Sequence, residues 1–209
     1  MADSTQYFND VASNWDRMRT DFFSERVREK SYAVANVQAG MRALDVGAGT
    51  GFVTEGLLKL GANVIAIDQS EAMLSEMRRK FAEYGSVDFR QARADDLLPL
   101  PDSSVELCFA NMYLHHVESP QAAISEMARV LEPGGKLVIT DLDSHDHDFL
   151  RTEQNDRWLG FAREDVTTWM EQAGLHDVAV DCSGEECCGA SCDGSDSANI
   201  SIFLASGTR

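Results

Sequence analysis

The sequence predicts an α/β fold in which helices cover both faces of a mostly parallel β-sheet. Short apolar runs alternate along the chain with segments whose apolar residues recur every three or four positions, which is typical of repeated strand–helix units. The chain has 209 residues, of which 44% are hydrophobic and 25% charged, enough for one domain with a substantial core. This composition excludes a disordered chain and a fibrous repeat.

The first half of the chain supplies two strand–helix units and a third strand. Residues 42–46 form an apolar run that ends in a glycine turn, and residues 63–67 form a run rich in β-branched side chains, so both are predicted strands. Residues 52–60 follow as a helix that a glycine ends, and residues 71–84 form a second helix with an apolar stripe. The short run 87–90 is the third predicted strand.

The second half continues the alternation. Strands are predicted at residues 105–110 and 136–140, on either side of a helix at residues 121–131 that ends at Pro-Gly-Gly. A helix at residues 163–173 is followed by two final strands, at residues 178–182 and 200–205.

The domain organisation is predicted to be simple. Residues 1–209 read as a single domain, with residues 1–36 as added N-terminal helices and residues 37–209 as the core. The segment from Cys182 to Ser197 consists mostly of Cys, Gly, Ser, Asp and Glu, and is predicted to be a cysteine-rich loop between the last two strands.

The charge and the termini narrow the function classes. Lys and Arg number 18 against 35 Asp and Glu, a net charge of −17 that would repel nucleic acid. No apolar run reaches the roughly 20 residues of a membrane helix, and the first residues lack the basic and apolar regions of a secretory signal. We therefore expect a cytoplasmic protein that binds neither nucleic acid nor membrane.

A glycine-rich turn follows the first predicted strand. Gly47, Gly49 and Gly51 stand at alternate positions, where the absence of Cβ lets the backbone approach a ligand. Asp68 ends the second strand and can accept hydrogen bonds from both hydroxyls of a ribose. The alternative for Asp68 is a helix N-cap, but Ser70 is better placed for that role. The G-x-G-x-G spacing does not match the dinucleotide fingerprint, which disfavours a nicotinamide dehydrogenase.

With this glycine turn and strand-end aspartate, the chain resembles the class I methyltransferases that use S-adenosyl-L-methionine. It is most similar to the group containing the ubiquinone/menaquinone-biosynthesis C-methyltransferases and the arsenite methyltransferases. The resemblance implies a Rossmann-like, doubly wound, seven-stranded sheet that is mostly parallel, with the last strand antiparallel. The segments that carry it are residues 44–51, 67–70, 97–102, 114–117 and 130–137.

The resemblance also implies which residues bind S-adenosyl-L-methionine and its product S-adenosyl-L-homocysteine. Asp45 and the glycine turn would lie by the methionine part, Asp68 would bind the ribose, and Asn111 would face the methyl donor. Either Asp95 or Asp96 would contact the adenine. The implied cofactor-binding set is Asp45, Gly47, Gly49, Gly51, Asp68, Gln69, Met73, Ala94, Asp95 and Asn111.

The acceptor is expected to be a small molecule. His115 and His116 follow the fourth strand, and one of them could act as a general base; the alternative is that one packs in the core and the other caps a loop. The N-terminal segment, with aromatic residues such as Trp15, would be either a lid over the site or an ordinary packed helix.

Cysteines suggest a soft acceptor or a metal site. Cys187, Cys188 and Cys192 are expected at the carboxyl edge of the sheet, and thiolates favour soft ligands such as trivalent arsenic. The hypothesis is therefore a methyltransferase acting on a thiol or metalloid. The alternatives are a flexible, redox-sensitive loop, and a cofactor-binding metal or redox sensor without transferase activity.

Overall fold

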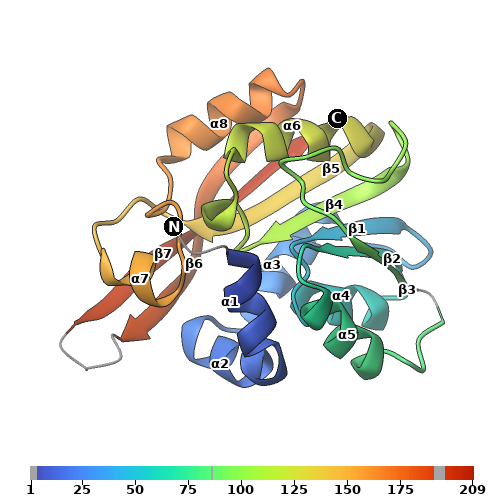
Figure 1. Ribbon diagram of the computed structural model, residues 1–209. Coiled ribbons are helices and arrows are strands. Elements are labelled where there is room, and N and C mark those ends of the chain that lie inside the picture. Colours follow the sequence, from blue (N-terminus) through green and yellow to red (C-terminus); the bar gives the residue numbers. More distant parts are fainter. Residues whose placement is uncertain (1–3, 86, 191–195) are drawn as a thin grey trace.

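The computed structural model describes residues 4–85, 87–190 and 196–209. Seven strands form one sheet in the order β3-β2-β1-β4-β5-β7-β6, and β7 runs antiparallel to both of its neighbours. The predicted doubly wound sheet with an antiparallel last strand is therefore confirmed (Figure 1). The strands are β1 Arg42–Val46, β2 Asn63–Asp68, β3 Val87–Gln91, β4 Val105–Asn111, β5 Leu131–Leu142, β6 His176–Ala190 and β7 Ser197–Thr208.

Helices cover both faces of the sheet because its central strands are buried on both sides. In β4, Leu107 and Phe109 belong to one buried cluster, whereas the alternate residues Cys108 and Ala110 belong to the other. α3, α4 and α5 pack on the first cluster, and α6 and α8 pack on the second (Figure 1). The helices are α1 Ser4–Val11, α2 Trp15–Phe22, α3 Arg26–Ala35, α4 Phe52–Lys59, α5 Glu71–Lys80, α6 Pro120–Val130, α7 Phe149–Glu153 and α8 Arg163–Gln172, with 3₁₀ turns η1 Ala12–Asn14 and η2 Leu114–His116.

The N-cap of α5 is Ser70 and not Asp68. The Ser70 hydroxyl accepts a hydrogen bond from Met73 N at 3.1 Å, so Ser70 is the N-cap of α5, as the sequence indicated. Asp68 is therefore not needed as the cap, and its carboxylate lies at the carboxyl end of β2.

The predicted cysteine-rich loop is wrong. The structure continues β6 to Ala190, and its last part pairs with β7 from Glu185↔Ile202 to Ala190↔Ser197 after an irregularity between Cys182 and Glu185. The composition of this segment gave no strand signal, because its apolar cover is supplied by the partner strand, where Ile200 and Ile202 are buried. Cys187 and Cys188 thus belong to a strand, and Cys192 lies outside the described residues.

The N-terminal helices cross the carboxyl ends of the strands. On one side, the Asp16 carboxylate accepts hydrogen bonds from Thr50 Oγ1 at 2.6 Å and Lys80 Nζ at 3.0 Å. On the other, the Tyr7 hydroxyl donates to Gln154 Oε1 at 2.7 Å, just after α7. The added helices predicted for this segment are therefore present, and they bridge the two halves of the sheet edge; their role as a lid stays a prediction.

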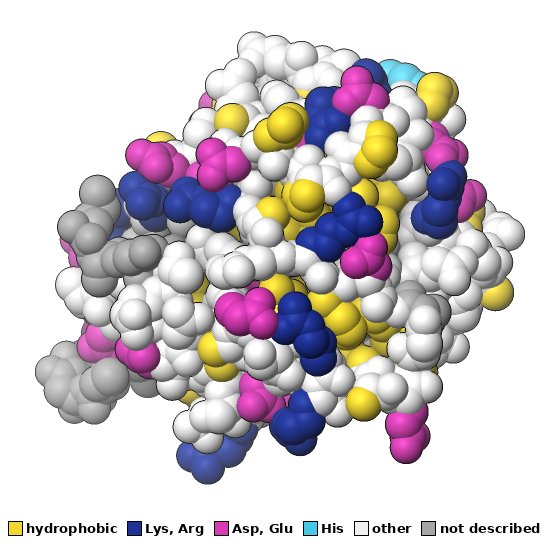
Figure 2. Space-filling model, turned by 45° about the vertical axis from the view of Figure 1, so that its right-hand side comes forward, with side chains coloured by type: hydrophobic (Ala, Val, Ile, Leu, Met, Phe, Trp, Pro, Cys, Tyr) yellow, Lys and Arg dark blue, Asp and Glu magenta, His cyan; other side chains and the backbone are white. Residues whose placement is uncertain are grey.

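On the face that Figure 2 presents, charged side chains of both signs are interspersed. Figure 2 shows Lys and Arg side chains lying beside Asp and Glu side chains across the face it presents, despite the net charge of −17. Among the described helices, none is long and apolar enough to cross a membrane.

Candidate active site

A cavity of about 680 Å³ lies at the carboxyl ends of β1, β2 and β4. This is the edge where open α/β sheets bind their ligands. Six of the ten predicted cofactor-binding residues line it: Gly47, Gly49, Asp68, Gln69, Met73 and Asn111.

Gly47 and Gly49, in the turn after β1, border this cavity in left-handed backbone conformations. Gly47 has φ +67°, and a Cβ at this position would lie 2.1 Å from the Tyr113 ring. Gly51 has φ +92° but lies outside the cavity lining; there a Cβ would approach the Phe81 ring to 2.4 Å. Gly47 is therefore required for the shape of the cavity, and Gly51 for the packing of α4 against α5.

Asp68 offers a carboxylate to the cavity. Its Oδ2 accepts a hydrogen bond from Gly49 N and its Oδ1 from Ser70 N, both at 2.8 Å. Each oxygen has a second acceptor position, enough for two sugar hydroxyls. Burial raises the pKa of Asp68 to about 6, although the backbone donors pull it down. The carboxylate is thus ionised at neutral pH and fits a ribose diol.

Asp45 lies beneath the glycine turn and outside the cavity lining. It is 1% exposed, and its Oδ2 accepts hydrogen bonds from Thr54 N at 2.9 Å and Thr54 Oγ1 at 2.6 Å. Burial raises the pKa of Asp45 to about 7. The side chain therefore anchors the first turn of α4, whose amides have no partner within the helix. Its contact with the methionine part stays a prediction.

The segment after β3 has its polar groups already engaged. Asp95 points inward and binds Arg93 through two hydrogen bonds of 2.8 and 3.0 Å, whereas Asp96 is exposed. Ala94 N donates to the Tyr113 hydroxyl at 3.0 Å. Neither Ala94 nor Asp95 lines the cavity, but Arg93 and Tyr113 do. An adenine bound at Ala94 would have to replace the Tyr113 hydroxyl.

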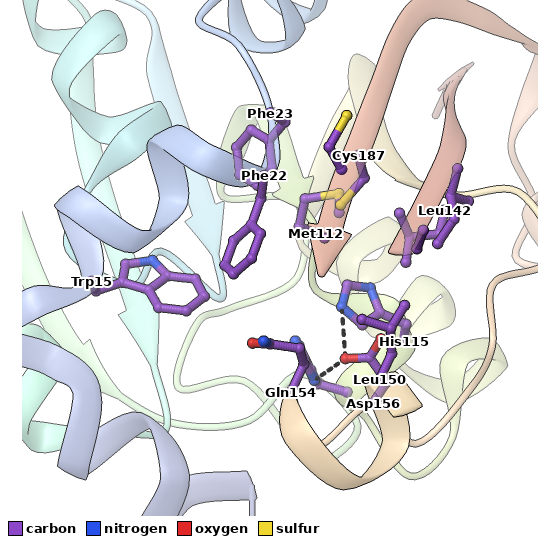
Figure 3. Close-up of a pocket in the computed structure, with 15 residues that line it drawn as sticks. Trp15, Phe22, Phe23, Met112, His115, Leu142, Leu150, Gln154, Asp156 and Cys187 are labelled. Carbon is purple, nitrogen blue, oxygen red and sulfur yellow. Dashed lines mark ion pairs between the residues drawn. The ribbon is translucent and has the colours of Figure 1, made fainter. Parts of the chain in front are cut away.

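A second cavity of about 550 Å³ adjoins the first. Figure 3 shows Trp15, Phe22 and Phe23 on one side of it, His115, Leu150 and Asp156 on another, and Met112 beside Cys187. The two cavities share part of their walls, so a molecule in one lies next to a molecule in the other. The shared residues are Trp15, Phe23, Met112 and His116.

The predicted histidines are held in a buried cluster with two aspartates. His115 Nδ1 lies 2.6 Å from Asp141 Oδ1, and His115 Nε2 lies 3.8 Å from Asp156 Oδ1. His116 Nδ1 lies 3.4 Å from the carbonyl oxygen of Asn155, which can only accept a hydrogen bond. His116 therefore carries its proton on Nδ1, and Nε2 is left as an acceptor.

The charges in this cluster separate the roles of the two histidines. Burial would lower the pKa of His115, but the carboxylates of Asp141 and Asp156 outweigh it and raise the pKa to about 9. Burial and the charge of His115 together hold the pKa of His116 well below its usual value. At neutral pH, His115 is thus a cation and His116 a neutral base facing both cavities.

Two groups of side chains have metal-binding chemistry. Single atoms of His115, His116 and Asp156 lie within 4.8 Å of one another, but the cation on His115 already balances one carboxylate of this cluster. Cys187 lines the second cavity, and burial raises its thiol pKa to about 12, which disfavours the thiolate that binds metals. Cys188 is exposed and donates to Asn199 Oδ1 at 3.5 Å.

Sequence reasoning missed several residues of this site. Asp141 and Asp156 complete the histidine cluster, and Arg19 and Met112 line the cofactor cavity. Asp141 lies one residue before the end of the buried strand β5, which was a usable signal, because side chains at that edge meet the ligand. Asp156 belongs to no motif, and only the folded chain brings it to the histidines.

The chain matches a family model and many known proteins. A family model described as a methyltransferase domain matches residues 44–139. The chain is 36% identical over 142 residues to the demethylmenaquinone methyltransferase of Clavibacter sepedonicus, covering 66% of this chain and 57% of that protein. It is 31% identical to the ubiquinone biosynthesis O-methyltransferase of Hahella chejuensis, covering 68% and 62%. The chain thus spans about three-fifths of the length of these curated relatives.

Solved structures share the fold at low sequence identity. A chain in the complex between the Haloferax volcanii Trm112 methyltransferase activator and the putative methyltransferase aligns with a TM-score of 0.77 and 20% identity, covering 96% of both chains. Phosphoethanolamine N-methyltransferase 2 of Haemonchus contortus, solved with S-adenosyl-L-methionine, aligns with a TM-score of 0.69 and 16% identity, covering 87% of this chain and 52% of that one.

Proposed function

Because the chain belongs to the class I S-adenosylmethionine-dependent methyltransferases, we propose that it transfers a methyl group from S-adenosyl-L-methionine to a small apolar acceptor with an ionisable proton. The observation that carries this proposal is the apolar second cavity, which shares a wall with the cofactor cavity and contains a neutral histidine. The activity and the acceptor are proposals, since the relatives are longer proteins.

S-adenosyl-L-methionine, when bound, supplies a methyl group already activated on a sulfonium. The residues of the chain have to position the two reactants, and alignment of this kind is worth roughly 7–11 kcal/mol in favourable cases. Asp68 would bind the ribose, and the Gly47–Gly49 turn leaves room for the ligand backbone to approach. The aromatic side chains of Trp15 and Phe23, on the wall between the cavities, would exclude water.

His116 would take the proton from the acceptor. Its Nε2 is free to accept because Nδ1 faces the Asn155 carbonyl. His115, held as a cation between Asp141 and Asp156, would keep His116 neutral and fixed in place, with the two rings 4.0 Å apart. Positioned bases of this kind contribute about 10²–10⁴-fold to a rate.

The acceptor that best fits the second cavity is a flat apolar ring with a hydroxyl group. The cavity walls combine aromatic and aliphatic side chains with a polar cluster that contains His116 and Asp156. Relatives named for demethylmenaquinone and ubiquinone biosynthesis act in quinone synthesis, which supports a hydroquinone-like acceptor.

A thiol or metalloid acceptor is the second candidate. It rests on Cys187, which faces the second cavity beside Met112 (Figure 3). Cys188 also lines this cavity, although it is exposed, and the predicted ligand Cys192 lies outside the described residues.

The experiment is an acceptor screen that measures S-adenosyl-L-homocysteine release with hydroquinones, alkyl thiols and arsenite. We expect turnover with hydroquinones, and a drop in kcat of about 10²-fold or more for His116→Gln with unchanged S-adenosyl-L-homocysteine affinity. The control is His176→Gln, since His176 is exposed and lines neither cavity. Binding of cofactor without turnover on any acceptor would favour the sensor alternative.

A further inference from the structure

Asp156 is a buried carboxylate whose only charged neighbours in the described part of the chain are two histidines. Its side chain is 4% exposed, and one of its oxygens lies 3.8 Å from His115 Nε2 and 3.9 Å from His116 Nδ1 (dashed lines in Figure 3). Both distances are too long for a hydrogen bond. A charge buried to this degree is normally hydrogen-bonded, closely paired or bound to a metal, so the arrangement points to a cation held among the three side chains.

The spacing of the three side chains fits a small transition-metal ion. One atom from each of His115, His116 and Asp156 lies within 4.8 Å of the other two. Around a tetrahedral zinc ion with bonds of about 2.0–2.2 Å, neighbouring ligand atoms are roughly 3.3–3.5 Å apart. The separations of 3.8 and 3.9 Å to Asp156 would therefore shorten by only about half an ångström, which small side-chain rotations allow.

Neighbouring groups already orient both imidazole rings. Asp141 is fully buried, and its Oδ1 lies 2.6 Å from His115 Nδ1. Metal-binding histidines almost always donate their second ring N–H to a carboxylate, a carbonyl or a water, and Asp141 takes this place for His115. The His116 ring is held between the rings of His115 and Phe8, at centroid distances of 4.0 and 4.9 Å.

The charges and the position of the cluster favour a divalent ion. Asp141 and Asp156 are two buried carboxylates, and the single positive charge of His115 balances only one of them. A divalent ion in place of the His115 proton would balance both. Because His115, His116 and Asp156 all line the second cavity, a fourth coordination position would open toward that cavity.

We propose that His115, His116 and Asp156 bind a divalent transition-metal ion such as Zn²⁺, and that the bound ion inhibits methyl transfer. The metal bonds to His115 Nε2, His116 Nδ1 and one Asp156 oxygen. The Nε2 proton of His115 leaves to solvent, and the His116 proton moves from Nδ1 to Nε2. His116 then has no ring nitrogen free to accept a proton. The inhibition rests on the proposed function, whereas the metal site does not.

The test uses Co²⁺ as a spectroscopic probe on the full chain, followed by competition with Zn²⁺. Asp156→Asn removes a metal ligand but keeps the shape of the side chain, and Asp141→Asn weakens the orientation of His115. One control is His176→Gln, because His176 also pairs with an aspartate, Asp177, at 2.9 Å, but on the surface. The second control is Cys187→Ser, which removes the buried thiol of the same cavity.

We expect the wild type to bind one Co²⁺ per chain, with the strong visible absorption of four-coordinate cobalt, and to release it to equimolar Zn²⁺. Asp156→Asn should lose this absorption, Asp141→Asn should bind about 10- to 100-fold more weakly, and both controls should match the wild type. Unchanged absorption in Asp156→Asn would overturn the site, as would no binding by the wild type. A sulfur-to-cobalt absorption that Cys187→Ser removes would also overturn it.

The inhibition is tested separately, on the acceptor found in the screen above. Zn²⁺ should lower the turnover of the wild type, a chelator should restore it, and Asp156→Asn should keep its own metal-free rate when Zn²⁺ is added. Binding of Zn²⁺ without loss of turnover would overturn the inhibitory role. Absence of turnover with every acceptor would instead overturn the proposed function, and the cobalt absorption would still decide whether the metal site exists.

Discussion

Replacing Gly47 with alanine should damage the protein far more than the same change at Gly134. Both glycines have positive φ, +67° and +84°, so alanine at either position meets a backbone cost of about 1–2 kcal/mol. A Cβ at Gly134 has nothing within 4 Å, whereas a Cβ at Gly47 would lie 2.1 Å from the Tyr113 ring. The ring of Tyr113 is fixed by its hydroxyl, which accepts from Ala94 N. Moving it adds the cost of overpacking a filled site, about 1–3 kcal/mol.

The assay is urea unfolding of the two variants together with S-adenosyl-L-homocysteine titration. We expect Gly47→Ala to lose about 2–5 kcal/mol of unfolding free energy, the sum of the two costs, and Gly134→Ala to lose only the backbone part. Cofactor affinity should fall in Gly47→Ala alone, because only that glycine borders the cavity. If the two variants unfold within about 0.5 kcal/mol of each other, an ordinary surface change, the reasoning about the Tyr113 contact is refuted.

Three further predictions concern ionisable groups. The pKa of His115 is raised to about 9 in the folded chain. The stability that this residue contributes is therefore complete below about pH 6.5 and is lost as the pH rises through 9. Urea unfolding between pH 6 and 10 should show this decrease in unfolding free energy in the wild type and not in His115→Gln. Asp68 has a pKa of about 6, so S-adenosyl-L-homocysteine affinity should fall as the pH drops below 6, and an affinity that stays level down to pH 5 would contradict its role as an ionised acceptor. Arsenite retention, measured as bound arsenic per chain, should be no greater in the wild type than in Cys187→Ser at neutral pH, since the thiol pKa is about 12; retention that depends on Cys187 would support the metalloid candidate instead.

The strand–helix alternation was predictable because each element carries its own local signal. The apolar runs of β1 and β2 and the Ser70 cap depend on neighbours in the sequence. The long end of β6 was not predictable, since residues 185–190 become a strand only through pairing with β7. Composition alone therefore assigned this segment to a loop.

The same distinction holds at the site. Gly47 and Asp68 could be singled out because a glycine turn and a strand-end carboxylate have a meaning in the sequence itself. The acid–base cluster needed the fold, because Asp156 lies 40 positions from His116 and reaches it only after α7. Arg19 gave no signal in the sequence, as a lone arginine in a polar helix is ordinary.

Calorimetry of S-adenosyl-L-homocysteine binding to the wild type and to Asp68→Ala tests the central claim most directly. The cavity at the carboxyl ends of β1 and β2, with a carboxylate placed for a ribose diol, predicts binding by the wild type and a loss of about 10- to 100-fold in the variant, as for other hydrogen bonds to charged groups. No heat with the wild type at millimolar ligand, or equal affinity in both proteins, would contradict it.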